Sequence, residues 1–167
     1  MRVTIERSAF LKALNHVQSV VERRNTIPVL SNVLVQAKQG VVKLTATDLD
    51  IEIVETVAAE TAREGAATVP AHMLYDIVRK LPDGAQLQLE QGPDSSRVAI
   101  TAGRSKFALQ ALPAEDFPDL SSGEFGNTFA LPAASLKFLI EKTRFAISTE
   151  ETRYYLNGIY LHQAKQA

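Results

Sequence analysis

VPAHMLYDIVRKL (69–81) and LPAASLKFLIEKT (131–143) are two versions of one segment, separated by 62 positions. Both begin with Pro-Ala after an apolar residue, and both place a leucine four residues and a lysine ten residues after the proline. Proline suits the first turn of a helix, where its nitrogen needs no hydrogen-bond partner. The apolar positions recur at helical spacing, so each version predicts an amphipathic helix.

A third copy lies near the N-terminus. Leu11, Leu74 and Leu136 occupy equivalent positions, and LKAL (11–14) matches LKFL (136–139). Each helix follows a short strand, and the first two helices precede about three alternating strands. Such units bury their helix faces against their sheets. The repeat therefore predicts an α+β fold in which two helices pack on two antiparallel sheets.

The apolar periodicity also predicts where elements begin and end. We expect the first helix to be capped by Ser8 and to run to about Val21. A hairpin should turn at Gly40, and the next strand should be DIEIVETVA (50–58). Short strands should precede the second and third helices. GIYLHQA (158–164) has the composition of a strand.

Residues 112–127 are predicted to be a linker, since they contain two prolines, two glycines and no clear period. Residues 1–111 then form a first domain, and residues 128–167 form the first part of a second. This second part ends in a predicted strand that has no hairpin partner. We therefore expect the chain to be a fragment of a longer protein.

The composition is that of a globular protein, with 46% apolar and 22% charged residues. The absence of cysteine excludes disulfides, zinc–thiolate sites and thiol nucleophiles. No segment resembles a signal peptide or has the length of a membrane span. These features predict a cytoplasmic protein without a membrane partner.

Charge is unevenly distributed, although the net charge is only -1. Residues 1–24 carry five Arg and Lys against two Glu, whereas residues 48–64 carry six Asp and Glu against one Arg. The predicted helices are thus basic, and one strand-rich segment is acidic. Attraction of a polyanion to one face is one explanation, and ordinary solvated helix faces are another.

The sequence contains no recognisable catalytic motif for phosphate, dinucleotide or zinc chemistry. In TDLDIEI (47–53), a strand would place Asp48, Asp50 and Glu52 on one face, as a two-metal phosphoryl-transfer site requires. A solvated sheet face explains the same alternation more simply. We therefore expect no catalytic residue, metal or cofactor, and keep a metal-dependent enzyme as an alternative.

Several segments resemble one known family, the bacterial DNA polymerase III beta subunits or sliding DNA clamps. These segments are TATDLDIEI (45–53), VPAHMLYDIVRKLPDG (69–84), AGRSKFAL (102–109), LPAEDFP (112–118) and RYYLNG (153–158). The resemblance runs from Met1 to about Leu161. It implies a DNA-clamp fold in a three-domain, non-catalytic processivity factor that forms a head-to-tail ring dimer around duplex DNA.

The resemblance also implies a set of DNA-binding residues, which are Arg24, His72, Glu150, Tyr154 and Tyr155. His72 stands where clamps commonly have basic residues, so this helix start should grip DNA less firmly. Glu150 lies in the DNA loop, but its charge argues against direct contact with phosphate. Without the resemblance, Arg24 is an ordinary loop arginine and the two tyrosines are a packed pair.

Two protein interfaces follow from the same resemblance. Leu156 would border the pocket that binds peptides of polymerase and clamp-loader subunits. Ile77, Leu81, Phe107 and Leu109 would form the homodimer interface at an edge strand. Alternation alone would assign Phe107, Leu109 and Leu156 to ordinary core. A protein-interaction module that has this repeated fold but binds only peptides is the second alternative.

Overall fold

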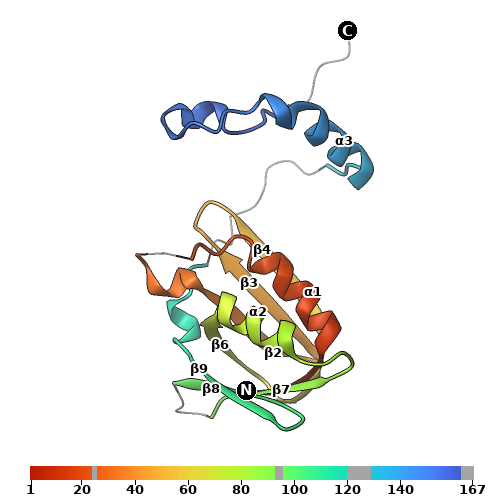
Figure 1. Cartoon of the computed structure of the whole chain (residues 1–167), viewed down its shortest axis with the longest axis vertical. Helices are drawn as coiled ribbons and strands as arrows, with labels where there is room; N and C mark the ends of the chain where they lie inside the picture. The colour runs from red at the N-terminus through yellow and green to blue at the C-terminus, as the bar shows by residue number, and fades with distance from the viewer. Residues whose placement is uncertain (24–25, 93–95, 120–128, 163–167) are drawn as a thin grey trace. The chain divides into compact units, whose positions relative to one another are not determined.

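A computed structural model describes residues 1–23, 26–92, 96–119 and 129–162. The chain divides into two compact units, Met1–Ser121 and Ser122–Ala167 (Figure 1). We describe each unit by itself. The boundaries predicted from sequence, with a domain over 1–111 and a linker over 112–127, stay a prediction.

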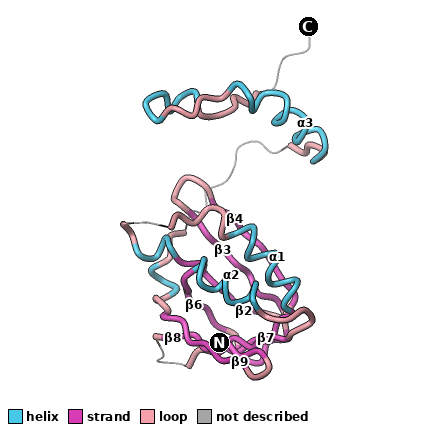
Figure 2. The backbone as a smooth tube through the Cα atoms, in the orientation of Figure 1, coloured by secondary structure: helices cyan, strands magenta, loops and turns pink. Residues whose placement is uncertain are grey.

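The first unit contains two α-helices and nine strands in its described residues (Figure 2). In chain order they are β1 (Arg2–Glu6), α1 (Arg7–Val17), β2 (Asn32–Lys38), β3 (Val41–Thr47), β4 (Glu52–Ala58), β5 (Glu60–Arg63), β6 (Gly65–Pro70), α2 (Ala71–Lys80), β7 (Gln86–Glu90), β8 (Arg97–Ala102) and β9 (Ser105–Gln110). Short 3-10 helices span Pro28–Ser31 and Ala114–Asp116. The β2–β3 hairpin turns at Gly40 as predicted, with positive φ angles at Gln39 and Gly40.

The two repeats interlock through their sheets, both of which are antiparallel. One sheet has the strand order β5-β1-β7-β8-β9, and the other has the order β4-β3-β2-β6. The first strand of each repeat thus joins the sheet of the other repeat: β1 pairs with β7, and β6 pairs with β2. The predicted fold class is confirmed, and β5 is a strand that the sequence analysis missed.

Both helices bury one apolar face against these sheets and lie in contact with each other (Figure 1). Helix α1 buries Phe10, Leu14 and Val17, and α2 buries Leu74 and Val78, all in one continuous core. Complete burial of a large apolar side chain contributes about 1.5–3 kcal/mol. The apolar positions that the repeat predicts on each helix are therefore the positions whose burial stabilises the unit.

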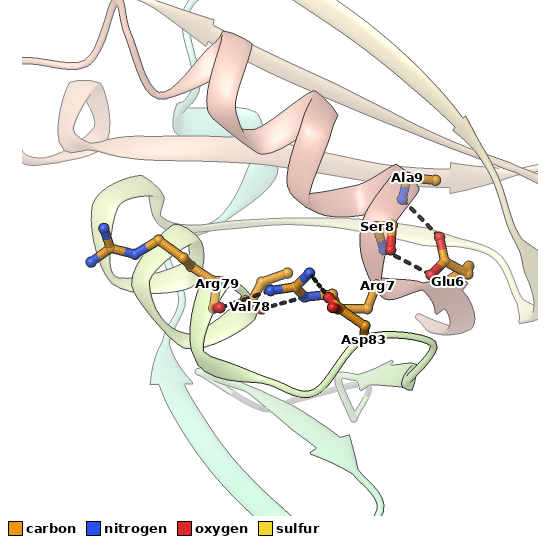
Figure 3. A network of polar contacts seen from close by, with 7 residues as sticks. All are labelled: Glu6, Arg7, Ser8, Ala9, Val78, Arg79 and Asp83. Carbon is orange, nitrogen blue, oxygen red and sulfur yellow. Dashed lines mark hydrogen bonds and ion pairs between the residues drawn. The ribbon is translucent and has the colours of Figure 1, made fainter.

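Helix α1 begins and ends earlier than the sequence predicts. The carboxylate of Glu6, not the hydroxyl of Ser8, caps it by accepting hydrogen bonds from the N–H groups of Ser8 and Ala9, both at 2.8 Å (Figure 3). These hydrogen bonds lower the pKa of the Glu6 carboxyl below its ordinary value. The helix ends at Val17 rather than Val21, where the Ser19 hydroxyl donates to the His16 carbonyl at 2.7 Å and competes with further helical turns.

Arg7 joins the start of α1 to the end of α2 (Figure 3). Its Nε donates to the Val78 carbonyl at 3.2 Å, and its Nη2 donates to the Arg79 carbonyl at 2.8 Å. Its Nη1 donates to Oδ1 of Asp83 at 2.6 Å. The last carbonyls of a helix have no intrahelical partner and carry partial negative charge, so a cation is favourable there.

The second unit contains α3 (Ala133–Thr143) and two 3-10 helices, Arg144–Ala146 and Glu151–Leu156. The strands predicted before α3 and from Gly158 onward are wrong over the described residues 129–162, which contain no strand. A strand needs a neighbour to pair its backbone groups, and this unit provides none within the described residues. None of the helices in the described ranges combines the length and apolar character needed to cross a bilayer.

Candidate nucleic-acid and protein interfaces

The helix faces that point away from the sheets carry basic side chains. Lys12 on α1 and Arg79 and Lys80 on α2 are exposed. Arg79 donates to Oδ1 of Asp76 at 2.9 Å, and its guanidinium lies 5.5 Å from the centre of the Tyr75 ring. Within the described part of the chain, Lys12 and Lys80 form no ion pair, so their charges are available to a polyanion.

Lys12 and Lys80 are absent from the DNA-binding set predicted from sequence. Both lie outside the apolar stripe of an amphipathic helix, and this position is the signal by which sequence reasoning could have identified them. The two lysines show that basic side chains of the helical segments lie on an exposed surface. Their side chains extend the candidate nucleic-acid surface beyond the loop residues.

His72, predicted to contact DNA, is the second residue of α2 and is half-buried. Its Nε2 lies 2.8 Å from the carbonyl oxygen of Val21, and its Nδ1 lies 2.9 Å from Oε1 of Gln18. Both ring nitrogens are thus occupied within the fold. Neighbouring Met73 is 55% exposed, and its thioether brings no charge to this surface.

Arg24 lies outside the described residues, so its predicted DNA contact stays a prediction. The residues that lead to it are described. Val21 is buried, whereas Glu22 and Arg23 are exposed. Arg23 is therefore the described cation closest in sequence to the predicted contact.

The 3-10 helix Glu151–Leu156 in the second unit exposes the other predicted residues. Tyr154 and Tyr155 are 78% and 71% exposed, and their rings meet edge to face with centroids 5.7 Å apart. Glu150 accepts from Arg153 at 3.0 Å, and the negative charge of Glu150 is partly neutralised by this ion pair. Leu156 is 46% exposed. Within their unit, these aromatic rings are not core side chains.

The predicted dimer residues lie where α2 meets strand β9. Ile77, Leu81 and Phe107 line one hollow of about 530 Å³ together with Met73 and Lys80. Phe107 is 38% exposed, whereas Leu109 is 3% exposed and belongs to the core. The structure thus brings three of the four predicted residues together and places Leu109 in the interior.

Strand β9 ends its sheet, because in the described residues it pairs only with β8 along its length. Its outer N–H and C=O groups therefore face no neighbouring strand. A free edge beside an apolar hollow is a surface to which another strand can add.

The acidic segment TDLDIEI does not form the carboxylate cluster that a metal site requires. Asp48 starts a turn, in which its Oδ1 accepts from the N–H groups of Asp50 at 3.0 Å and Ile51 at 2.8 Å. Leu49 has a φ of +83°, and β4 begins only at Glu52. Asp48, Asp50 and Glu52 therefore do not share one strand face, and that premise of the metal-enzyme alternative is wrong.

Histidine and carboxylate side chains do not gather elsewhere either. Over residues 1–23, 26–92, 96–119 and 129–162, no group of three or more could hold a metal ion. The Nδ1 of His16 instead lies 2.6 Å from Oε1 of Glu55, and this hydrogen bond links α1 to β4. The described chemistry of this chain consists of exposed cations, exposed aromatic rings and an apolar edge.

Two known domain families match the sequence. The N-terminal domain of the DNA polymerase III beta subunit matches residues 1–121, and the central domain of the same subunit matches residues 130–167. The first match alone covers 121 of 167 residues, well over half of the chain.

Full-length relatives are similar over nearly all of this chain. The beta sliding clamp of Caulobacter vibrioides (strain NA1000 / CB15N) is 56% identical over 166 residues, which are 99% of this chain and 45% of the relative. A crystal structure of the DNA polymerase sliding clamp from Caulobacter crescentus has a TM-score of 0.93 at 56% identity and covers 99% of this chain and 45% of that one.

A third relative was crystallised with a bound molecule. The sliding clamp (DNA polymerase III subunit beta) from Bartonella birtlesii, bound to griselimycin, has a TM-score of 0.91 at 56% identity and covers 97% of this chain and 43% of that one. This chain therefore spans less than half the length of the relatives that it matches.

Proposed function

Because the chain belongs to the family of DNA polymerase III beta subunits, we propose that it works as part of a sliding clamp that encircles duplex DNA. The full-length clamp would hold a replicative polymerase on its template as a processivity factor, without catalysis of its own, in the cytoplasm. Residues 1–111 would form its first domain, 112–127 a linker, and 128–167 the start of the second domain.

The observation that carries this proposal is the exposed basic face of the helix pair. Lys12 and Lys80 project from helices whose opposite faces are buried on the sheets, and Lys80 also lines the rim of the hollow beside β9. Such cations attract phosphates over several ångströms without reading base sequence. A clamp needs this kind of attraction, because it must hold DNA and still slide along it.

Specific contacts to DNA would come from loops. Arg24 would bind phosphate, and Tyr154 and Tyr155 would pack on sugars and donate hydrogen bonds to phosphate oxygens. Glu150 would contribute through its ion pair with Arg153 rather than by touching phosphate.

The protomers would meet at the β9 edge. Ile77, Leu81 and Phe107 would be covered by the other protomer of a homodimer, with strand addition along β9. Leu109 would support this surface from inside the core.

Peptides of polymerase and clamp-loader subunits would bind near Leu156. Its side chain is 46% exposed within the described part of this unit. A relative that binds griselimycin is consistent with such a site on this family of clamps.

The DNA contact can be tested in a full-length clamp that carries this sequence. Combined Arg24→Ala and Tyr154→Ala substitutions should weaken DNA binding about tenfold, because losing a phosphate contact and an aromatic contact removes about 1–3 kcal/mol. The slope of log K against log salt should fall by about 0.9 for the lost arginine contact.

Lys38→Ala is the matched control, since it removes one exposed cation from the end of β2. It should leave affinity and slope nearly unchanged. Equal effects of the control and the combined variant, or no effect of either, would refute the assignment of Arg24 and Tyr154.

A further inference from the structure

His72 connects two segments that are far apart in the sequence. Its Nδ1 meets Gln18, 54 residues earlier, and its Nε2 meets the Val21 carbonyl, 51 residues earlier. Gln18 and Val21 belong to the turn that follows α1, whereas His72 belongs to the first turn of α2. The imidazole ring therefore ties the end of one helix to the start of the other.

The chemistry of the partners determines where the ring protons lie. A backbone carbonyl only accepts hydrogen bonds, so Nε2 of His72 carries a proton and donates it to Val21. When the ring is neutral, Nδ1 is an acceptor and receives the amide N–H of Gln18. When the ring is charged, Nδ1 donates to the amide oxygen, and a half-turn of the Gln18 amide serves either case.

The ring consequently has no nitrogen left for a phosphate. Direct contact would require His72 to give up one of two hydrogen bonds and leave Gln18 or the Val21 carbonyl without its partner. Leaving a partly buried polar group without a partner is unfavourable. Holding the turn is the role that both short contacts support.

The turn itself is fixed on two sides at Val21. The Val21 side chain is 5% exposed and belongs to the core, and its N–H donates to the Gln18 carbonyl at 3.3 Å. His72 holds the carbonyl of the same residue. The direction in which the chain leaves Val21 is thereby set, and exposed Arg23 follows only two residues later.

We propose that His72 is a positioning residue for DNA binding: it fixes the turn after α1 so that Arg23 is presented to the phosphate backbone. The effect on DNA binding rests on the proposed clamp function. The two hydrogen bonds by which His72 holds Gln18 and Val21, called the tether below, do not rest on it. The family resemblance predicts a direct contact with DNA for this histidine. The hydrogen bonds assign it an indirect effect on DNA through a neighbouring loop.

The first measurement concerns the tether and uses this chain without DNA. Amide hydrogen exchange followed by NMR should be about tenfold faster at Val21 in His72→Ala, because one hydrogen bond holding the turn is lost. Core strand amides should exchange at unchanged rates, and His72→Gln, which retains a donor, should restore slow exchange. Met73→Ala is the control, since this exposed neighbour makes no such contact.

The second measurement is a double-mutant cycle in DNA binding by the full-length clamp. His72→Ala should weaken binding several-fold alone, and it should add almost nothing when Arg23→Ala is already present. A histidine that touched phosphate directly would instead give additive losses.

The outcomes separate the proposal from the proposed function. Faster exchange at Val21 with a non-additive cycle supports the positioning role. Unchanged exchange in His72→Ala, or additive losses, overturns it. If the unsubstituted clamp does not bind DNA at all, the proposed function fails, and the exchange rate at Val21 alone decides whether the tether exists.

Discussion

Arg7 holds the start of α1 against the end of α2 through contacts that its place in the sequence does not predict. Its side chain is only 13% exposed, and its guanidinium reaches two helix-terminal carbonyls and one carboxylate. No local pattern predicts these contacts, because the partners lie more than 70 residues away. Local pattern also fails to predict the contacts of His72: the family resemblance places it among the DNA contacts, whereas its ring nitrogens lie within hydrogen-bond distance of Gln18 and Val21.

Arg7→Ala is expected to lower the free energy of unfolding of this chain by about 1–3 kcal/mol, because the Val78 and Arg79 carbonyls lose a charged donor. Chemical denaturation measures the change. Arg79→Ala is the matched control: its ion pair with Asp76 lies on the surface of one helix, and both side chains are about half-exposed. The control should cost at most about 1 kcal/mol, and equal losses in both variants would contradict a special role of Arg7.

At the scale of elements, helical periodicity predicted both helices of the first unit correctly in type and approximate position. The errors lie where single side chains bind the backbone. Glu6 caps α1 in place of Ser8, and Asp48 builds a turn where alternation predicted a strand. Periodicity reports burial along an element, but it contains no information about a carboxylate that redirects the chain at its end.

The candidate site was predictable to a similar extent. The resemblance identified an edge strand and its apolar neighbours, and the structure places Ile77, Leu81 and Phe107 around one hollow. The resemblance could not show which of Phe107 and Leu109 is exposed and which is buried, since both lie on the same face of β9. Only packing shows that Leu109 is covered while Phe107 reaches the surface.

Phe107→Ala in a full-length clamp should weaken homodimerisation about tenfold or more, because removing an apolar contact at an interface costs about 1.5–3 kcal/mol. Sedimentation equilibrium over a concentration series measures the dissociation constant. Val41→Ala is the control, because Val41 has nearly the same exposure, 37% against 38%, but lies on the other sheet. A dimer that is insensitive to Phe107→Ala would argue against the β9 interface.

At the scale of the whole molecule, one small unit is used repeatedly. Each repeat supplies a helix with an exposed face and three neighbouring strands of one sheet, β2–β4 or β7–β9, and the first two repeats interlock through β1 and β6. The third copy of the helix begins the second unit. In the proposed ring, the helices that face the hole can be basic while the whole chain stays near neutral, at a net charge of -1.

The proposed clamp mechanism is topological: a closed ring stays on DNA because it encircles DNA, and close contacts are secondary. Retention of a loaded full-length clamp on nicked circular DNA, before and after the circle is cut, tests this most directly. We predict stable retention on the circle and rapid release once the DNA is linear. Equal retention on circular and linear DNA would contradict a sliding ring and would indicate ordinary binding to the duplex.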